Sequence, residues 1–581
     1  MRSFEVKAIG VTAAAFAAAL LVGASCSRVA DDCQLNVTCP GDGVKAGSGG
    51  AGGSGGQGVS ASESASTSTS TGASSGTGGT LVCVPGMLSS CYDGPLGTEN
   101  VGVCKSGMHA CQDDGSAYGA CTNQVLPSAE NCVQPADEDC DGKAAGCTGA
   151  TLEGGDLGTA GTDEIIFAVA ADSAGSAFLG GVSGATPPSG QVFAISSGDA
   201  GINKILKDGS LAWSVVMQSS GGGGYSVVRG LAVDQQGNVL AVGEFQGTMT
   251  EGAINVTSAG GSDIFLVKLD PTGKTLWAKA FGNPADQAGY AVAVDQNGNV
   301  FITGQIVGGV NFGGGVVSAG AGNNLFVTKL DATGNHLWSK AFGDDANQAG
   351  YSVAATPEGD VVVAGELGGT VDFGVGITLK SSGGTDVFVA KLAGAGGATT
   401  WANRYGDVNN QTANGVAVGS DGSVVLTGSI VGTCDFGGGP LKANGGSNVF
   451  VTKLHPDGSH DWSHGYGSDI DNQAGLGVAI DPAQNILVVG YLKGTITFGG
   501  TILTDASAAQ NTDMFVAKLS AAGAPVWARG FGDVNDQTAW AVTADSAKNV
   551  FFAGTFAGTV NLPPSITSMG SYDGFWAKLA P

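Results

Sequence analysis

Asp263-Ile264-Phe265-Leu266-Val267-Lys268-Leu269 is the clearest copy of a short phrase that recurs along the chain. The lysine of this phrase falls at positions 204, 268, 329, 391, 453, 518 and 578, with separations of 64, 61, 62, 62, 65 and 60 residues. A nearly fixed period of this length indicates stacked copies of one supersecondary unit. The repeat therefore sets the architecture before any other feature is considered.

Each copy contains four strand-sized runs with alternating apolar residues, bounded by Gly, Asp and Asn. In the copy that follows the quoted phrase, the first strand is expected at 291–294 and the second at 299–303, with Gly304 ending it. The phrase itself is the third strand, and the fourth begins at Trp277, nine residues after the lysine. Four antiparallel strands per copy, repeated seven times, predict an all-β fold, a seven-bladed β-propeller.

The two ends of the repeat region favour a closed ring over the competing fold, a linear β-solenoid. The seventh copy stops at Pro581, before its fourth strand. Residues 151–158 align with the fourth strand of another copy, 275–282, although Glu153 stands where that copy has Trp277. This N-terminal strand is expected to complete the last blade, which removes strand edges that would otherwise invite aggregation.

The charge of the chain restricts its partners. Lys+Arg 24 against Asp+Glu 50 gives a net charge of -26 over 581 residues. Such a surface repels phosphate backbones and anionic lipid headgroups, which proteins bind through clustered Lys and Arg. We therefore expect no nucleic-acid partner, and membrane association only through a lipid anchor.

The N-terminus has the pattern of an export signal. Arg2 and Lys7 precede an apolar run at 8–21, which is too short to cross a bilayer as a helix. Small residues before Cys26 resemble the bacterial lipobox, which implies lipidation of Cys26; a plain secretory signal is the alternative. Ser27 in the next position resembles lipoproteins sorted to the outer membrane. The expected location is the bacterial outer membrane or cell surface.

Composition divides the rest of the chain into three parts after the signal at 1–26. Residues 27–80 are rich in Gly and Ser and predict a disordered tether. Residues 81–150 hold eight cysteines between Cys83 and Cys147, which predicts a small disulfide-rich module of an exported protein. The propeller takes 151–581. Cys434 is left over within it and is expected to be buried.

One acidic run in the Cys-rich module could bind a metal ion. Asp137, Asp139 and Asp141, followed by Gly142, reproduce the first half of a calcium loop, with alternate carboxylates converging on one cation. Thr148 stands where the bidentate Glu of such a loop is expected. The alternatives are a weak Ca²⁺ site and a solvated acidic turn, and Ca²⁺ is the only cofactor expected.

Two resemblances complete the organisation. The spacing of Cys91, Cys104, Cys111 and Cys121, with the run that ends at Gly142, resembles the cysteine-rich metal-binding segments of bacterial surface lipoproteins. The copies at 151–581 resemble the SBBP repeat, the seven-bladed β-propeller repeat of bacterial surface and exported proteins. The second resemblance implies a propeller and no particular activity.

Polar pairs between the fourth strand of one copy and the first strand of the next are the main site prediction. In a propeller they would ring the mouth of the central channel and could bind a sugar, a peptide or a cation; equally, they could only satisfy backbone groups between blades. The candidate residues are Asp163, Asp286, Gln287, Asn347, Gln348, Asn410, Gln411, Asn472, Gln473, Asp536 and Gln537.

No catalytic motif occurs in a usable context, and Gly-x-Gly strings in a chain with 102 glycines carry no weight. The expected function is therefore a non-enzymatic, lipid-anchored surface scaffold that binds an envelope or extracellular polysaccharide or a protein ligand. One alternative is a propeller enzyme, a polysaccharide lyase or hydrolase acting through Asp163, Asp286 or Asp536. The other is a calcium-binding surface protein.

Overall fold

The computed structural model describes residues 82–95, 97–101, 103–127, 149–185, 197–252, 254–468, 471–506 and 511–581. All regular secondary structure in these residues is β. No helix in the described part of the chain is long and apolar enough to cross a membrane.

The described part of the Cys-rich region is held by disulfides. Strands β1 (Leu88–Cys91) and β2 (Gly107–Ala110) form a two-stranded sheet. Disulfides join Cys83 to Cys111 and Cys91 to Cys121. The prediction of disulfide bonds is confirmed, and they indicate that the chain folds in an oxidising, extracellular environment.

The repeats form seven four-stranded antiparallel blades, as predicted. The innermost strands are β4 (Asp163–Ala171), the second half of β7 (Leu211–Val233), β12 (Ala288–Val294), β18 (Gln348–Ala355), β24 (Gln411–Val418), β28 (Ala474–Ile480) and β34 (Gln537–Ala544). The second strands are β5 (Ala177–Ala185), β8 (Val239–Glu251), β13 (Val300–Ile306), β19 (Val361–Leu367), β25 (Val424–Asp435), β29 (Ile486–Leu492) and β35 (Val550–Phe556).

The repeated phrase forms the third strand of each blade. The segment that contains a tryptophan, such as Trp277, forms the outermost strand of most blades. The third strands are β6 (Asp199–Ile205), β10 (Asp263–Leu269), β16 (Asn324–Leu330), β22 (Asp386–Leu392), β26 (Pro440–Leu454), β32 (Asp513–Leu519) and β38 (Asp573–Leu579). The outermost strands are the first half of β7, β11 (Thr275–Phe281), β17 (His336–Phe342), β23 (Thr399–Tyr405), β27 (His460–Tyr466), β33 (Pro525–Phe531) and β3 (Thr151–Asp156).

Short accessory strands lie between the second and third strands of six blades. They are β9 (Ile254–Thr257), β14 (Val310–Asn311), β15 (Val316–Val317), β20 (Thr370–Asp372), β21 (Thr378–Lys380), β30 (Thr495–Phe498), β31 (Thr501–Thr504), β36 (Thr559–Val560) and β37 (Ile566–Thr567), and in the fifth blade the extended β25 and β26 pair at the same place. The first two blades share β7, so their strands form one continuous sheet.

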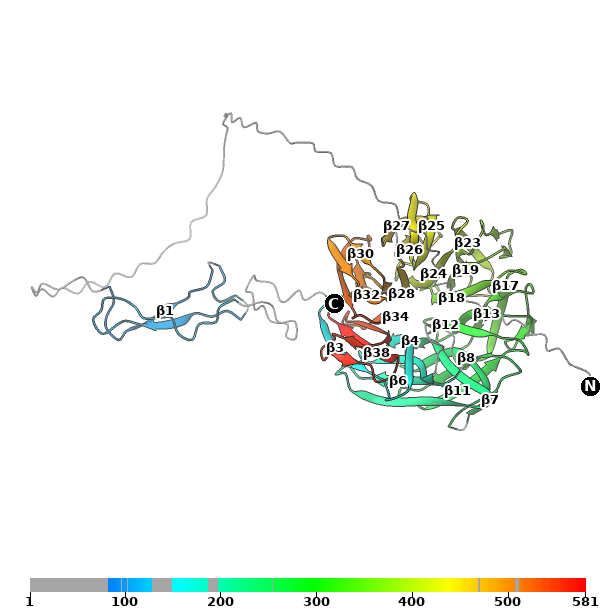
Figure 1. Cartoon of the computed structure of the whole chain (residues 1–581), viewed down its shortest axis with the longest axis horizontal. Coiled ribbons are helices and arrows are strands. Elements are labelled where there is room, and N and C mark those ends of the chain that lie inside the picture. Colours follow the sequence, from blue (N-terminus) through cyan, green and yellow to red (C-terminus); the bar gives the residue numbers. More distant parts are fainter. Residues whose placement is uncertain are drawn as a thin grey trace, which may run out of the picture. The chain divides into compact units, whose positions relative to one another are not determined.

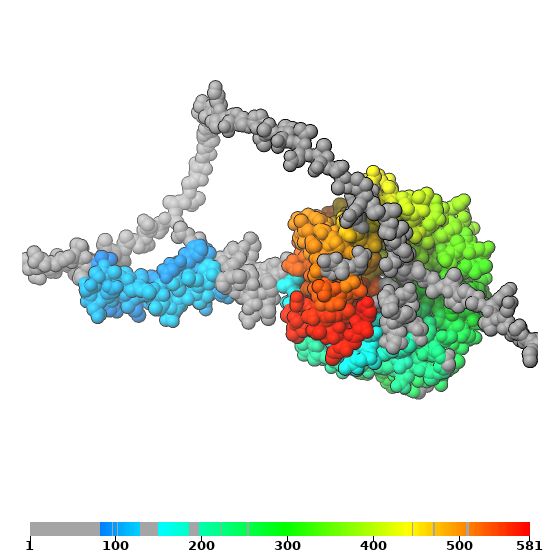
Figure 2. All heavy atoms as spheres, viewed as in Figure 1, coloured from blue at the N-terminus to red at the C-terminus, as the bar shows by residue number. Residues whose placement is uncertain are grey.

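The ring closes where the N-terminal strand pairs with the C-terminal one. Each inner strand packs on the next, from β4 through β7, β12, β18, β24 and β28 to β34, which packs on β4 again. Strand β3 pairs antiparallel with β38, and Glu153 lies opposite Lys578 as Trp277 lies opposite Lys268 in the second blade. The predicted closure and the alignment of Glu153 are thus confirmed (Figure 1). Figure 2 shows the first blade, in cyan, beside the last, in red.

The closing strands reproduce a turn without a covalent link. In the second blade the turn after the phrase has hydrogen bonds from Gly273 N–H to Asp270 O (3.0 Å) and from Asp270 N–H to Lys274 O (2.8 Å). At the closure, Gly149 N–H donates to Ala580 O (3.2 Å) and Ala580 N–H donates to Ala150 O (2.7 Å). The two chain segments therefore occupy the two halves of one tight turn.

The core lies between blades. Phe301 and Val327 of the third blade pack with Val363 and Phe388 of the fourth, and all four are fully buried. Burying one such side chain contributes about 1.5–3 kcal/mol. Because the apolar faces of neighbouring blades cover each other, a single blade could not bury its own core.

One sequence expectation about strand ends was wrong. Gly304 lies inside β13 instead of ending it. A Cβ at Gly304 would come within 2.0 Å of the carbonyl oxygen of Ala288 on the neighbouring inner strand. The glycine is therefore required by a close approach of two backbones and not by a turn.

Candidate functional site

The glutamines of the predicted polar pairs are buried in the scaffold. Gln287, Gln348, Gln411, Gln473 and Gln537 are each at most 1% exposed. Gln411 shows the pattern: its Nε2 donates to Val431 O (2.6 Å) and Asp407 Oδ1 (2.8 Å), and its Oε1 accepts from Asp407 N–H (3.1 Å). These side chains tie the start of the inner strand to the loop that leaves the second strand.

The first members of the pairs connect neighbouring blades. Asp286 Oδ1 accepts from Ser262 N–H (3.0 Å), and Asp163 Oδ1 accepts from Ser571 N–H (2.8 Å) and Tyr572 N–H (3.0 Å) across the ring closure. Equivalent bonds from the preceding blade reach Asn347, Asn410, Asn472 and Asp536. Each pair thus contributes to the contact between two blades, and ligand binding by the pairs stays a prediction.

The remaining predicted sites fall elsewhere. Cys26 and the run Asp137, Asp139, Asp141 lie outside the described residues, so lipidation and calcium binding stay predictions. Among the residues that are described, no group of three or more His, Cys, Asp or Glu side chains could hold a metal ion. Cys434 is fully buried, and burial raises the pKa of its thiol to about 12.

A different set of side chains lies on the innermost strands, which surround the axis of the ring. Every inner strand has a β-bulge at the same place, three residues after the glutamine position, where the register against the second strand shifts by one. A bulge turns the side chain of its extra residue out of the alternating pattern. The bulge residues are all partly exposed, one per blade: Phe167, Arg229, Tyr290, Tyr351, Asn414, Leu476 and Trp540.

A second set of axial residues supports the bulge residues. Each of its members is the residue directly after the glycine of a second strand. The seven residues are Val182, Glu244, Gln305, Glu366, Ser429, Tyr491 and Thr555. In three blades the two sets bond directly: Arg229 pairs with Glu244 (2.7 Å), Tyr351 OH donates to Glu366 Oε1 (2.8 Å), and Trp540 Nε1 donates to Thr555 Oγ1 (3.2 Å). We call these fourteen residues the axial annulus.

Bulge residues also meet across blade boundaries. The rings of Tyr290 and Tyr351 lie 5.5 Å apart between centroids, and those of Phe167 and Trp540 lie 5.9 Å apart. The Arg229 guanidinium lies 4.6 Å from the centre of the Phe167 ring. These contacts run from blade to blade around the ring, as expected for side chains gathered near its axis.

The annulus has two unlike arcs. Blades two to five provide an arc with two carboxylates, Glu244 and Glu366, two tyrosines and the amide of Asn414. Blades six, seven and one provide an apolar arc with Leu476, Trp540 and Phe167. Burial raises the pKa of Glu366 although hydroxyl groups donate to it, and burial beside carboxylates raises the pKa values of Tyr290 and Tyr351. The annulus therefore has one polar and one apolar arc, and burial disfavours the charged forms of Glu366 and the two tyrosines.

Sequence reasoning missed the annulus because its residues share no chemical type. The available signal was positional: five of the seven blades keep a glutamine at one position, whereas the residue three positions later varies from Arg to Trp around the ring. The sequence identifies the annulus through one repeat position whose residue changes from blade to blade, and not through a motif.

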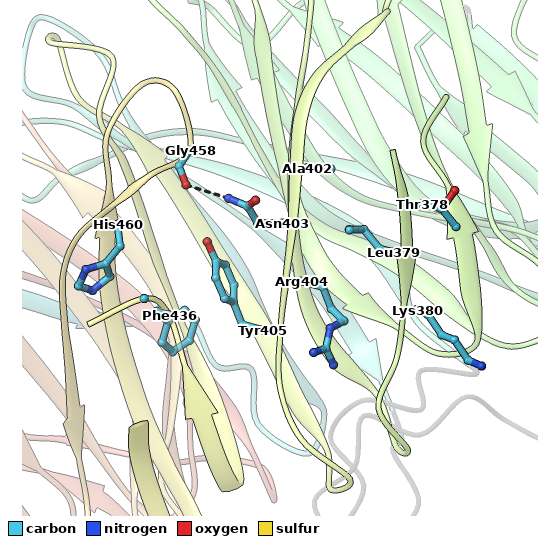
Figure 3. A pocket seen from close by; sticks show the side chains of 11 residues that line it. Thr378, Leu379, Lys380, Ala402, Asn403, Arg404, Tyr405, Phe436, Gly458 and His460 are labelled. Atoms are coloured by element: carbon cyan, nitrogen blue, oxygen red, sulfur yellow. Dashed lines mark hydrogen bonds between the residues drawn. The ribbon is translucent and has the colours of Figure 1, made fainter. Parts of the chain in front are cut away.

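Two grooves on the outer rim are a second candidate. One, of about 450 Å³, lies between the fourth and fifth blades and is lined by residues that include Lys380, Asn403, Arg404 and His460 (Figure 3). Asn403 Nδ2 donates to Gly458 O (2.8 Å) across it, while Arg404 is already paired with Asp386. The equivalent groove between the second and third blades, of about 500 Å³, contains Lys279 and His336. Both use the same repeat positions, so they follow from the way blades pack.

The fold and the annulus define the chain as a seven-bladed β-propeller protein with an individual set of side chains at its axis. No protein-family model matches the chain. Among curated proteins, an uncharacterised WD repeat-containing protein L264 of Acanthamoeba polyphaga mimivirus is 23% identical over 447 residues, 60% of this chain and 31% of that protein. The regulatory protein FlaEY of Caulobacter vibrioides is 25% identical over 217 residues, 36% of this chain and 22% of that protein. The matches thus span less than a third of either relative.

The solved structures that resemble the chain share little sequence identity with it and give low TM-scores. The WD40 domain of Neurospora crassa Pan2 gives a TM-score of 0.38 at 7% identity, covering 74% of this chain and 95% of that one. The quinohemoprotein alcohol dehydrogenase of Comamonas testosteroni gives 0.37 at 10% identity, covering 74% and 76%. The assignment of the fold rests on the strand pairing described above.

Proposed function

We propose that the chain is a non-enzymatic surface protein of the SBBP type, anchored through lipidated Cys26, whose propeller binds an envelope or extracellular ligand at the axial annulus. The observation that carries this proposal is the contrast between the repeated and the varied positions. The residues that join blades repeat around the ring, whereas the bulge position differs in almost every blade. Structural needs common to all blades explain the first group and leave the second free for recognition.

The three aspartates that the enzyme alternative assigned to catalysis support a role in binding rather than in turnover. Asp163, Asp286 and Asp536 each use one carboxylate oxygen to accept backbone N–H groups of the preceding blade. A general acid or base must instead reach the proton that it transfers. The proposed role is therefore binding without turnover.

A binding experiment on the secreted chain tests the proposal. We expect the purified protein to capture a component from arrays of polysaccharides and envelope proteins, and Trp540→Leu to weaken that capture at least tenfold. This variant keeps an apolar side chain at the bulge but removes the indole and its bond to Thr555. Val408→Ala, at a 72% exposed apolar residue of a connection between blades, is the matched control and should bind as the parent does.

Two results would contradict the proposal. One is capture that is lost equally in both variants while both remain folded by circular dichroism. The other is turnover of any glycan in the panel, since that would make the propeller an enzyme.

A further inference from the structure

The two rim grooves have a histidine where the other blades have a different residue. His336 and His460 each begin an outermost strand, opposite Leu330 and Leu454 at the end of the third strand, and each lines a groove. The corresponding residues of the other five blades are Thr151, Leu211, Thr275, Thr399 and Pro525. The packing of blades sets the position of the grooves, but it does not require the histidines.

A glycine makes room for each histidine ring. A Cβ at Gly314 would lie 2.1 Å from Cε1 of His336, and a Cβ at Gly438 would lie 2.4 Å from Cε1 of His460. The fourth blade, which has no histidine at this position, has Val375 in place of the glycine. The ring and the glycine beneath it therefore occur together, in two separate copies.

A hydrogen bond further restricts each ring. Nε2 of His336 bonds with Ser339 Oγ (2.6 Å), and Nε2 of His460 bonds with Ser463 Oγ (3.2 Å). Because the glycine loop and the serine both restrict the ring, little side-chain freedom is lost when a ligand binds. Within the described part of the chain neither Nδ1 forms a hydrogen bond, so this nitrogen can bond with a ligand.

The charged side chains that line the grooves are all cationic: Lys279 in one, and Lys380 and Arg404 in the other. Among the described residues no Asp or Glu lines either groove, although the chain has 50 acidic residues and only 24 Lys and Arg. Arg404 is paired with Asp386, whereas neither lysine forms an ion pair with any described residue. Each groove thus has one unpaired lysine in addition to its histidine.

An aromatic pair lines each groove. The ring centroids of Phe281 and Phe312 lie 5.2 Å apart in one groove, and those of Tyr405 and Phe436 lie 4.9 Å apart in the other. The volumes of these grooves, about 500 and 450 Å³, are in the range of small-ligand sites. Each groove therefore offers an aromatic base of suitable size for a ring-shaped ligand.

The two ends of the groove between the fourth and fifth blades differ in chemistry. Figure 3 shows His460 and Lys380 at opposite ends, with Tyr405 and Arg404 between them. A ligand that fills this groove meets an imidazole at one end and an ammonium at the other. A sugar with an acidic group satisfies both, because a hydroxyl group bonds with imidazole and a carboxylate or sulfate pairs with ammonium.

The net charge of the chain restricts the ligand further. At -26 the chain repels a densely charged polyanion such as a nucleic acid. At physiological ionic strength the Debye length is about 8 Å, so an oxyanion inside the groove interacts mainly with the side chains that line it. The chemistry thus fits single oxyanions spaced along a saccharide and not a chain of phosphates.

We propose that each rim groove binds an acidic sugar residue of a polysaccharide. Nδ1 of the histidine bonds with a sugar hydroxyl, the aromatic pair lies against the sugar ring, and Lys279 or Lys380 pairs with the carboxylate or sulfate. The two lysines occupy different repeat positions, so the two grooves should differ in affinity. This inference goes beyond the proposed function, because it adds two sites at the rim, outside the annulus.

Calorimetry with the full chain at pH 7.5 and physiological ionic strength tests the inference. Trigalacturonate is the probe, and its methyl ester is the uncharged counterpart. We expect two equivalents of the acid to bind per chain, at least tenfold more tightly than the ester. Lys279→Gln and Lys380→Gln should each leave one such equivalent. Lys274→Gln, at an exposed lysine of the second blade that lines neither groove, is the matched control and should bind as the parent does.

A histidine variant gives a second readout. His460→Thr introduces the residue that the fourth blade has at this position. It should weaken binding of both the acid and the ester at that groove, because the bond to the sugar hydroxyl is lost, whereas Lys380→Gln should weaken only the acid. Sulfated maltotriose distinguishes the two oxyanions: tighter binding than that of trigalacturonate identifies a sulfate ester, and weaker binding identifies a carboxylate.

Four outcomes would overturn the inference: equal affinity for the acid and its ester, a stoichiometry that neither lysine variant changes, binding of a trinucleotide as tight as that of trigalacturonate, or no heat from any probe at millimolar concentration. The proposed function is tested separately by Trp540→Leu, which should leave binding of trigalacturonate unchanged. If Trp540→Leu abolishes that binding, the acid binds at the annulus and the rim grooves are not its site.

Discussion

At the residue scale, the repeated lysine is a structural residue that joins blades. Lys268 Nζ pairs with Asp234 of its own blade (2.9 Å) and donates to Ala332 O of the next blade (3.2 Å). Lys578 makes the corresponding bond to Lys207 O (2.9 Å) across the closure. Its aliphatic stem packs in the sheet while the ammonium is satisfied between blades. Five of the seven lysines donate to a carbonyl of the next blade in this way, and the repetition of the residue follows from that shared structural role.

The acidic residue five positions before this lysine has a cost in some blades. Burial raises the pKa of Asp513 to about 6, and its Oδ1 has no hydrogen-bond partner. The third blade has Asn324 at this position, whose Nδ2 donates to Gly320 O and Gly322 O (both 2.8 Å). An amide therefore satisfies the same environment without a charge.

We predict that Asp513→Asn raises the free energy of unfolding at pH 7.5 by about 1–2 kcal/mol. Folded Asp513 holds its proton up to about pH 6, whereas the unfolded residue ionises near 3.8, so the folded chain binds more protons between these values. The contribution of Asp513 to stability therefore falls as the pH rises through this range. Chemical denaturation from pH 4 to 8 should show that the free energy of unfolding falls less with rising pH in the variant than in the parent. Asp372→Asn, at an exposed carboxylate, is the control. The prediction is contradicted if the pH dependence is unchanged in Asp513→Asn, or if Asp372→Asn gains as much stability.

At the scale of the strand, the bulge of each inner strand and the glycine of each second strand are linked by one close backbone contact. In each of the seven second strands the same glycine lies under an inner-strand carbonyl, at a distance that leaves no room for a side chain. The bulge that directs a residue toward the axis therefore depends on that glycine. This is why the sequence shows a glycine in the middle of a strand, where its conformational freedom is otherwise unfavourable.

We predict that Gly490→Ala destabilises the propeller by about 1–3 kcal/mol, because its Cβ would come within 1.9 Å of Ala474 O and the backbone must shift. Gly500→Ala, in the same blade, places its Cβ in open space and should change the free energy of unfolding by less than about 0.5 kcal/mol. Urea denaturation followed by tryptophan fluorescence measures both. Equal stabilities for the two variants would show that the bulge tolerates a side chain.

At the scale of the whole molecule, stability depends on a contact between residues far apart in sequence. Gly149 and Ala150 meet Ala580 in the split turn, and β3 completes the sheet of the last blade. Consecutive strands of the other blades are joined by the chain, whereas β3 and β38 are held together only by non-covalent contacts. The closure should therefore affect the stability of the entire ring.

We predict that removing Ala580 and Pro581 lowers the free energy of unfolding by about 1–3 kcal/mol, because both hydrogen bonds of the split turn are lost. Removing Pro581 alone keeps these bonds and is the control. Leu579, which is fully buried, remains in both variants. If thermal and urea unfolding of the two truncated chains coincide, the split turn does not contribute to stability.

The sequence by itself determined the number of blades, the order of strands and the closure, because a periodic pattern of apolar residues and tight turns is local and each copy repeats it. It also placed the polar pairs at the connections between blades. Only the tertiary structure showed that the first member of each pair bonds to the preceding blade while the glutamine is buried in its own, that Gly304 lies within a strand, and that the axial annulus exists. The physical reason is that a bulge and the meeting of seven side chains at one axis arise from pairing between strands and packing between blades, which no single copy of the repeat encodes.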